Sequence, residues 1–232
     1  MRSLVRRSMT SGVEEEERAP EVLVSLTEPM SAHADGYRML FAKIDSVLRV
    51  DEKKVVAVTS AVKGEGKTTT TANLVVVGAR DFGKRCLIID GDFSQPSVAK
   101  RFGLREEAGL IDVIAKKCPL GSAMKRGPVE NLTLLPMGHR PPKENNIWTS
   151  DSIKDVLKDV QPWFDYVFID APPILPLFDM NLISGTVDGI LIVARSGKTS
   201  EQLLAQAIRS VGSGKIIGSV LNGTKTGWPF KY

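Results

Sequence analysis

Apolar residues along the chain form short continuous runs that alternate with stretches of helical spacing. The first run, Val55–Thr59, is short and rich in β-branched residues, which predicts a buried strand rather than a helix. Similar runs predict further strands at Arg85–Ile89, Leu132–Pro136, Tyr166–Ile169, Gly189–Ala194 and Ile216–Leu221. Continuous apolar strands that alternate with helices are typical of an α/β fold, with a parallel sheet covered by helices on both faces.

Apolar positions three and four residues apart predict helices between and before these strands. We expect these helices at about 34–48, 67–82, 150–160 and 200–211, with Ser150 as an N-cap.

The chain divides into three parts. Residues 1–30 contain four consecutive glutamates and two prolines but little periodicity, which predicts a flexible N-terminal arm. We expect one folded domain over 31–222, in which 31–50 form an N-terminal helix. A short C-terminal tail is expected over 223–232.

Composition excludes several classes of protein. The 232 residues are 42% hydrophobic and 25% charged, as in an ordinary soluble domain. The net charge of +4 is scattered, without a basic stripe interleaved with aromatic residues, so we expect no nucleic-acid binding. Cys86 and Cys118 lack metal-ligand spacing, which favours a reduced, cytoplasmic protein. No apolar run approaches the roughly 18 residues of a membrane helix, so we expect no direct membrane insertion.

A glycine-rich segment follows the first predicted strand and opens a predicted helix. Ala61–Thr68 fits the Walker A pattern, with alanine in the first glycine position. Backbone N–H groups of such a loop bind phosphate, and Gly64 and Gly66 let the backbone approach it closely. Lys67 reaches the β- and γ-phosphates, and the Thr68 hydroxyl coordinates Mg²⁺. The sequence therefore predicts a P-loop NTPase-type sheet that binds ATP and Mg²⁺. The expected nucleotide-binding residues are Ala61, Lys63, Gly64, Glu65, Gly66, Lys67, Thr68 and Thr69.

Carboxylates follow two other predicted strands. Asp90 and Asp92 come after one strand, and Asp170 comes after another. Ligands of open parallel sheets bind at the carboxyl ends of the strands, so these side chains should lie beside the phosphate loop. We expect Asp170 to hold Mg²⁺ with Thr68 and Asp90. Asp92, together with Asp90, is expected to orient and deprotonate an incoming hydroxyl, which makes Lys67, Asp90, Asp92 and Asp170 the candidate catalytic residues.

These motifs, in this order, resemble the bacterial tyrosine kinases of capsule and exopolysaccharide systems, within the deviant P-loop ATPase group. The resemblance extends from about Asp35 to Asn222. Its motifs are Val58–Ser60 with Gly64–Thr68 (Walker A), Leu87–Asp92 (Walker A′), Phe168–Pro173 (Walker B), Asp179, Val187–Thr199 and Val220–Gly223.

The resemblance implies a tyrosine (auto)kinase that transfers the ATP γ-phosphoryl group to tyrosine, often on a neighbouring subunit, and so regulates polysaccharide biosynthesis and export. It also implies a membrane adaptor that recruits the protein to the inner face of the plasma membrane, and possible homo-oligomers that form through the helix over 31–50. By the same resemblance, Asn222 contacts the adenine base; the alternative is a turn residue before Gly223.

The sequence departs from the family pattern at three places, and these departures keep alternative functions open. Ser94, followed by Gln95, stands where the family carries an arginine near the transferred phosphate. In the oligomerisation motif, only Arg38 matches fully, since Asp35 and Phe41 replace its other members. The third departure is that the family's C-terminal tyrosine cluster is absent. The chain has three tyrosines: Tyr37 in the predicted N-terminal helix, Tyr166, which we expect to be buried, and Tyr232, the only one in the tail.

One alternative is a catalytically weakened ATP-binding regulator of polysaccharide export. Another is an ATPase like the partition and septum-positioning proteins. Those use an additional lysine at the position of Val62, whereas the nearest lysine here is Lys63, one residue further along.

Overall fold

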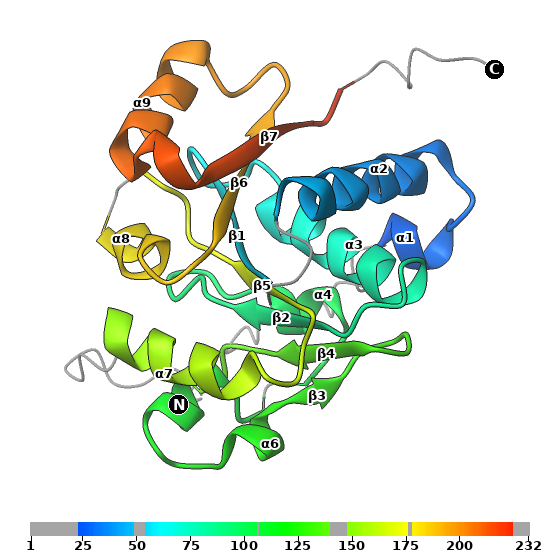
Figure 1. Ribbon diagram of the computed structural model, residues 1–232. Coiled ribbons are helices and arrows are strands. Elements are labelled where there is room, and N and C mark those ends of the chain that lie inside the picture. The colour runs from blue at the N-terminus through cyan, green and yellow to red at the C-terminus, as the bar shows by residue number, and fades with distance from the viewer. Residues whose placement is uncertain (1–22, 49–53, 106, 140–147, 176–177, 225–232) are drawn as a thin grey trace, which may run out of the picture.

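The computed structural model describes residues 23–48, 54–105, 107–139, 148–175 and 178–224 (Figure 1). Within these residues the chain forms one seven-stranded sheet in the order β3-β4-β2-β5-β1-β6-β7. The strands are β1 (Lys54–Ser60), β2 (Cys86–Asp90), β3 (Lys125–Arg126), β4 (Leu132–Leu135), β5 (Tyr166–Asp170), β6 (Gly189–Arg195) and β7 (Ile216–Asn222).

The strands pair in parallel except for β3, which runs antiparallel to β4. The expected α/β class and the mostly parallel sheet are confirmed. The ends of the predicted strands lie within one residue of the observed ones, while the short edge strand β3 was not predicted.

Helices cover both faces of this sheet. Their bounds are α1 (Val24–Thr27), α2 (Ala32–Val47), α3 (Lys67–Arg80), α4 (Val98–Arg101), α5 (Leu110–Ile114), α6 (Leu120–Ala123), α7 (Ser150–Val160), α8 (Phe178–Ser184) and α9 (Glu201–Val211), with a 3₁₀ turn, η1, at Ser213–Lys215. Figure 1 shows α1, α2 and α3 on one side of the sheet and α7, α8 and α9 on the other.

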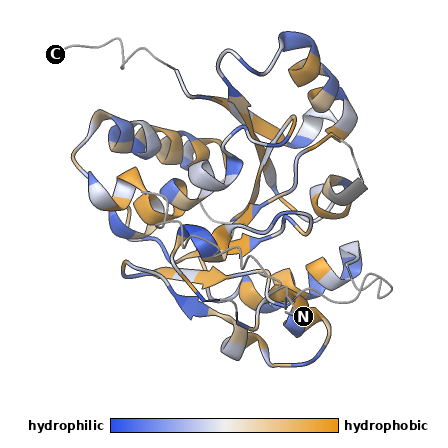
Figure 2. Ribbon diagram, turned by 180° about the vertical axis from the view of Figure 1, so that it is seen from behind, coloured by the Kyte–Doolittle hydropathy of each residue, from blue (hydrophilic) through white to orange (hydrophobic). Residues whose placement is uncertain are grey.

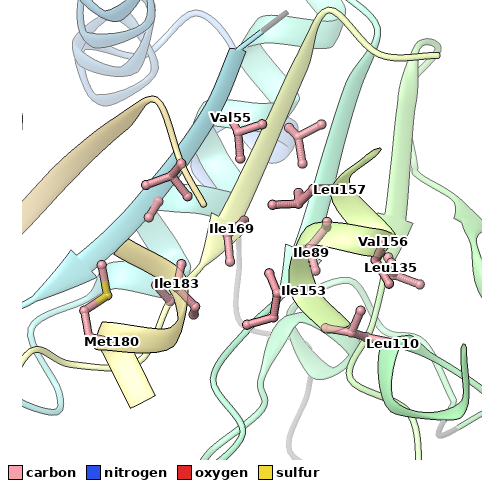
Figure 3. Packing of buried hydrophobic residues seen from close by; sticks show 14 of the residues in the cluster. Val55, Ile89, Leu110, Leu135, Ile153, Val156, Leu157, Ile169, Met180 and Ile183 are labelled. Carbon is pink, nitrogen blue, oxygen red and sulfur yellow. The ribbon is translucent and has the colours of Figure 1, made fainter. Parts of the chain in front are cut away.

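Each strand supplies side chains to both layers, because successive residues of a strand point to opposite faces. Val55 of β1 packs in the cluster under α7 and α8, whereas its neighbour Val56 packs in the cluster under α2 and α3. Figure 3 shows Ile153 of α7 beside Ile89 and Ile169 of the sheet. Hydrophobic residues are correspondingly concentrated in the strands, and hydrophilic residues in the loops and on outer helix positions (Figure 2).

The N-terminal segment differs from the expected arm. Residues 23–30 of that arm are part of the folded structure: Leu23 and Ser25 are buried, and the Ser25 N–H donates to Asn73 Oδ1 of α3 at 2.8 Å. Residues 1–22 lie outside the described residues. The low periodicity of the arm gave no sign of α1, because its four residues are too few to show a helical pattern.

Helix α2 packs on α3 through Phe41, a position at which this chain differs from the family's oligomerisation motif. Phe41 is completely buried, with its ring 4.7 Å from Phe82 and 5.0 Å from Tyr166. Arg38 donates to Asp81 Oδ2 at 2.8 Å and to Asp35 Oδ1 at 2.6 Å. In this chain, therefore, the motif positions make contacts within the domain.

Two helix ends also differ from expectation. Thr149, rather than Ser150, is the N-cap of α7, and its side chain accepts from the Ser152 N–H at 3.2 Å. Thr149 has the extended backbone that an N-cap needs, whereas Ser150 is already helical. Helix α3 ends at Arg80, two residues before the predicted end.

Candidate active site

The phosphate loop takes the backbone conformation that its glycines permit. It connects the end of β1 at Ser60 to the start of α3 at Lys67. Gly64 has φ +84° and Gly66 has φ +95°, and Gly66 is the N-cap of α3. A side chain is strained in this left-handed region. At Gly66 a Cβ would also lie 2.0 Å from Asn222 Nδ2, so that a side chain there would have to displace the Asn222 amide as well as adopt this strained backbone.

The sheet brings the predicted carboxylates to the same edge. Asp90 at the end of β2 is in register with Asp170 at the end of β5. Lys67 Nζ lies 2.7 Å from Asp92 Oδ2 and 3.7 Å from Asp170 Oδ1. The Thr68 hydroxyl donates to Asp170 Oδ2 at 2.6 Å. The five residues from three separate motifs thus form one buried cluster.

Asp90 is held by backbone groups. Its Oδ2 accepts from the N–H groups of Ser97 and Val98, each at 2.9 Å, and its Oδ1 accepts from the Asp92 N–H at 3.3 Å. Asp92 in turn accepts from the Gln95 N–H at 3.0 Å. These bonds fix the loop after β2, so Asp90 shapes the site in addition to any contact with a metal.

The electrostatics of the cluster favour binding of a cation. Burial, together with the charge of Asp170, raises the pKa of Asp90 to about 7. Burial also raises the pKa of Asp170. Burial alone would lower the pKa of Lys67, but the carboxylates of Asp170 and Asp92 outweigh it and the pKa is raised. The Lys67 ammonium group and the charge of Arg101 act on three carboxylates, and additional positive charge would stabilise these carboxylates further.

The oxygen atoms of the cluster suit Mg²⁺. Asp170 Oδ1 is buried and has no hydrogen-bond partner. The other oxygen atoms that could coordinate a metal at this sheet edge are those of the Thr68 hydroxyl, which is bonded to Asp170 Oδ2, and of the Asp90 carboxylate, which is in register with Asp170. Hard oxygen ligands of this kind are those that Mg²⁺ prefers. Among the described residues, no three or more His, Cys, Asp or Glu side chains are grouped to hold a metal by themselves. Such a site fits an ion that keeps water and phosphate oxygens in its coordination shell.

The remaining predicted binding residues line the loop to different degrees. Ala61 is buried and its carbonyl accepts from the Leu175 N–H at 3.0 Å, whereas Lys63 is exposed. Thr69 is half-buried in the first turn of α3. Asn222 Nδ2 donates to the Glu65 carbonyl at 3.0 Å. The amide of Asn222 is therefore bonded to the loop backbone.

Two polar contacts of the site were not found in the sequence. The Ser97 hydroxyl lies 2.9 Å from the Thr68 hydroxyl, and Arg195 Nη1 donates to the Gly64 carbonyl at 3.3 Å. Ser97 belongs to a loop without a recognised motif. The sequence leaves open whether Arg195, at a strand end, contacts the nucleotide or a neighbouring molecule; the structure places its guanidinium group at the phosphate loop.

Two of the three tyrosines lie within the described residues. Tyr166 is 2% exposed, as expected, and its hydroxyl contacts Asp45 and Lys54 Nζ. Tyr37 is half-buried, and burial raises its pKa, although the neighbouring Thr70 and Asn73 side chains of α3 oppose the effect. Tyr232 and the side chain of Asp179 lie outside the described residues.

Comparison with known proteins agrees with this geometry. Residues 53–216 match the AAA domain family AAA_31. The chain is 34% identical over 205 residues to tyrosine-protein kinase YwqD of Bacillus subtilis (strain 168), which covers 88% of this chain and 86% of that protein.

It is also 28% identical over 201 residues to the succinoglycan biosynthesis transport protein ExoP of Rhizobium meliloti (strain 1021), over 84% of this chain and 25% of that protein. In fold, it resembles the kinase domain of Escherichia coli tyrosine kinase ETK, with a TM-score of 0.81, 22% identity and coverage of 100% of this chain and 89% of the other.

Proposed function

Since this chain belongs to the bacterial tyrosine kinases within the AAA domain family, we propose that it transfers the γ-phosphoryl group of ATP to a tyrosine hydroxyl. The observation that carries the proposal is the convergence of Lys67 and Thr68 with Asp90, Asp92 and Asp170 at one sheet edge.

The phosphate loop and the start of α3 would bind the triphosphate. The first N–H groups of a helix have no partner within the helix and carry partial positive charge, so they suit phosphate oxygens. Lys67 would leave its contact with Asp92 for the β- and γ-phosphates. Thr68, Asp90 and Asp170 would hold Mg²⁺ directly or through water. When bound, this ion neutralises charge on the phosphate oxygens.

Asp92 would act on the acceptor. Once Lys67 turns to the phosphates, the Asp92 carboxylate is available to accept the proton of the tyrosine hydroxyl. The phenolic oxygen forms a bond to the γ-phosphorus as the bond from that phosphorus to the β,γ-bridging oxygen breaks. ADP leaves with the electron pair of the broken bond. Positioning and charge neutralisation supply most of the acceleration in such transfers.

The acceptor is either Tyr232 or a tyrosine of another molecule. Tyr166 is buried at the opposite end of β5 from Asp170, and Tyr37 is half-buried and packed against the cluster that contains the α3 side chains. Neither can reach the γ-phosphate without leaving its packing.

The process that we propose is capsular or exopolysaccharide biosynthesis and export. The similarity to ExoP, which is named for succinoglycan biosynthesis transport, supports this assignment. No helix among the described residues is long and apolar enough to cross a membrane. From the resemblance to the kinases of polysaccharide systems, we also propose a membrane adaptor as the partner that brings the chain to the inner face of the plasma membrane.

The experiment is phosphotyrosine mapping by mass spectrometry after incubation with MgATP, with and without the cytoplasmic end of a candidate adaptor. The test variant is Lys67→Met. Lys158→Met is the matched control, because Lys158 is exposed on α7. Phosphate on a tyrosine in the wild type and in Lys158→Met, but not in Lys67→Met, is the expected result. ATP hydrolysis without phosphotyrosine under every condition would refute a kinase.

A second candidate function is a weakened, ATP-binding regulator of the export machinery. The observation that favours it is Ser94, which is exposed beside Asp92 and provides no cation where the family carries arginine. Ser94→Arg separates the two functions. A large gain in tyrosine phosphorylation would support the weakened regulator, whereas unchanged phosphorylation would favour a competent kinase.

A further inference from the structure

Glu65 is an acidic residue inside a loop that binds anions. A carboxylate close to a triphosphate is expected to repel it, more strongly in a buried setting than in water. Yet Glu65 is 2% exposed and lies between the two glycines of the loop. A buried charge is maintained only where hydrogen bonds or opposite charges compensate its loss of hydration, so its partners indicate its role.

Both carboxylate oxygens of Glu65 have partners. Oε2 accepts from the Val62 N–H at 3.0 Å, which closes the loop upon itself. Oε1 accepts from the hydroxyl of Thr199, which lies 134 residues further along the chain. Glu65 therefore connects the phosphate loop to the turn between β6 and α9.

Thr199 is fixed as firmly as Glu65. Its hydroxyl oxygen accepts from the Arg195 N–H at 2.7 Å while its proton is donated to Glu65. Its own N–H donates to the Arg195 carbonyl at 2.9 Å. A hydroxyl that both donates and accepts has one favoured orientation, and a bond to an ionised group is stronger than a neutral one.

The backbone acceptors of the loop are also bonded from this side. Arg195 donates to the Gly64 carbonyl and Asn222 to the Glu65 carbonyl, at 3.3 and 3.0 Å. Residues from the ends of β6 and β7 thus hold the carbonyl groups of the loop. This leaves the N–H groups at the start of α3, which a helix cannot pair, for the phosphates.

We propose that Glu65 and Thr199 are positioning residues for the phosphoryl transfer. Their side chains do not touch the nucleotide; they hold the loop in its phosphate-binding conformation before ATP arrives. Binding then needs less ordering of the loop, which strengthens affinity without new contacts. This inference rests on the proposed function, since it concerns the loop that would bind its ATP.

The test compares three threonine variants of the full chain. Thr199→Val removes the donor at nearly constant volume, and Thr199→Ser restores it. Thr186→Val is the matched control, because the Thr186 hydroxyl also donates, to the Ile183 carbonyl at 2.7 Å, but in the turn before β6 at the opposite sheet edge. Equilibrium dialysis gives Kd for MgATP, steady-state kinetics of ATP turnover give KM and kcat, and thermal melting without nucleotide shows that each variant is folded.

Loss of a hydrogen bond to a charged group predicts that Thr199→Val raises Kd and KM about tenfold. We expect kcat to stay within about threefold, because a bond that orders the loop before ATP binds acts on ground state and transition state alike. Thr199→Ser and Thr186→Val should bind as the wild type does. Glu65→Gln, whose amide oxygen can accept only part of these bonds, should also weaken binding.

Equal MgATP affinity in Thr199→Val and the wild type would overturn the inference. So would an equal loss in Thr186→Val, which would indicate general destabilisation, or a lack of recovery in Thr199→Ser. Failure of the proposed function gives a different result: the wild type binds MgATP but forms no phosphotyrosine, and the comparison of affinities remains valid. A wild type that does not bind MgATP would overturn both.

Discussion

Lys67→Met should destabilise the protein even in the absence of ATP. Lys67 forms ion pairs with two buried carboxylates: its side chain is 10% exposed, and those of Asp92 and Asp170 are 4% and 0% exposed. Methionine has a similar length but no charge. Replacement therefore leaves buried anions without their partner, which is among the few changes that cost several kcal/mol.

The magnitude follows from the burial of the pair. Removing one member of a buried ion pair costs about 3–5 kcal/mol, a large share of a total stability of about 5–15 kcal/mol. In a domain of this size, about 2–4 °C for each kcal/mol converts this to a fall in Tm of roughly 6–20 °C. The loss should be greater at pH 8 than at pH 5, because protonation of the carboxylates in acid removes the unpaired charge.

The assay is urea unfolding at both pH values without nucleotide or magnesium, for Lys67→Met, Asp92→Asn and the double variant. Lys158→Met is the control and should stay within about 0.5 kcal/mol of the wild type. Asp92 contacts Lys67 at 2.7 Å, so the two substitutions should not be additive. The double variant should lose about 1 kcal/mol or more less free energy of unfolding than the two single losses added together. Additive effects, or a Lys67→Met variant as stable as the wild type, would refute the reasoning.

Three further predictions concern the surrounding structure. Phe41→Ala should lower the free energy of unfolding by about 3–5 kcal/mol in urea titrations, because a completely buried ring is removed. Gly66→Ala should abolish measurable MgATP binding, since its Cβ would lie 2.0 Å from Asn222 Nδ2 at a φ of +95°; binding near the wild-type affinity would contradict this. The hydrogen bond from Arg80 holds the pKa of Asp81 below its usual value, so its contribution is present above pH 4 and is lost as the pH falls through the lowered pKa. Asp81→Asn should therefore reduce stability at pH 7, and unfolding curves should show the difference shrinking toward pH 2.

The sequence alone determined the class of the fold and the edge of the sheet where the chemistry lies. Continuous apolar runs such as Tyr166–Ile169 occur where both faces of a strand are buried, so they predict a parallel sheet covered on both sides. Parallel strands place their carboxyl ends together, so polar residues after the runs predict one site. The phosphate loop was recognisable because its function depends on local spacing, in which Gly64, Gly66 and Lys67 are neighbours in the chain.

Only the tertiary structure decided which side chains meet across long separations. Asp90 and Asp170 lie in register because β2 pairs with β5, and the residues of these two strands do not predict that pairing. Phe41 was read as a change in an oligomerisation motif, but packing of α2 on α3 makes it part of the core.

The hydrogen-bond partners of Glu65 show most clearly that the sequence does not predict contacts between distant segments. A side chain signals its partner in the sequence only when the two are linked by a regular spacing, as in one turn of a helix or one strand pair. Glu65 and Thr199 lie on segments 134 residues apart. Their contact exists because β1 and β6 are neighbours and both end at the same edge of the sheet. The residues of the loop could therefore be identified from the sequence, while the contacts that hold its shape required the fold.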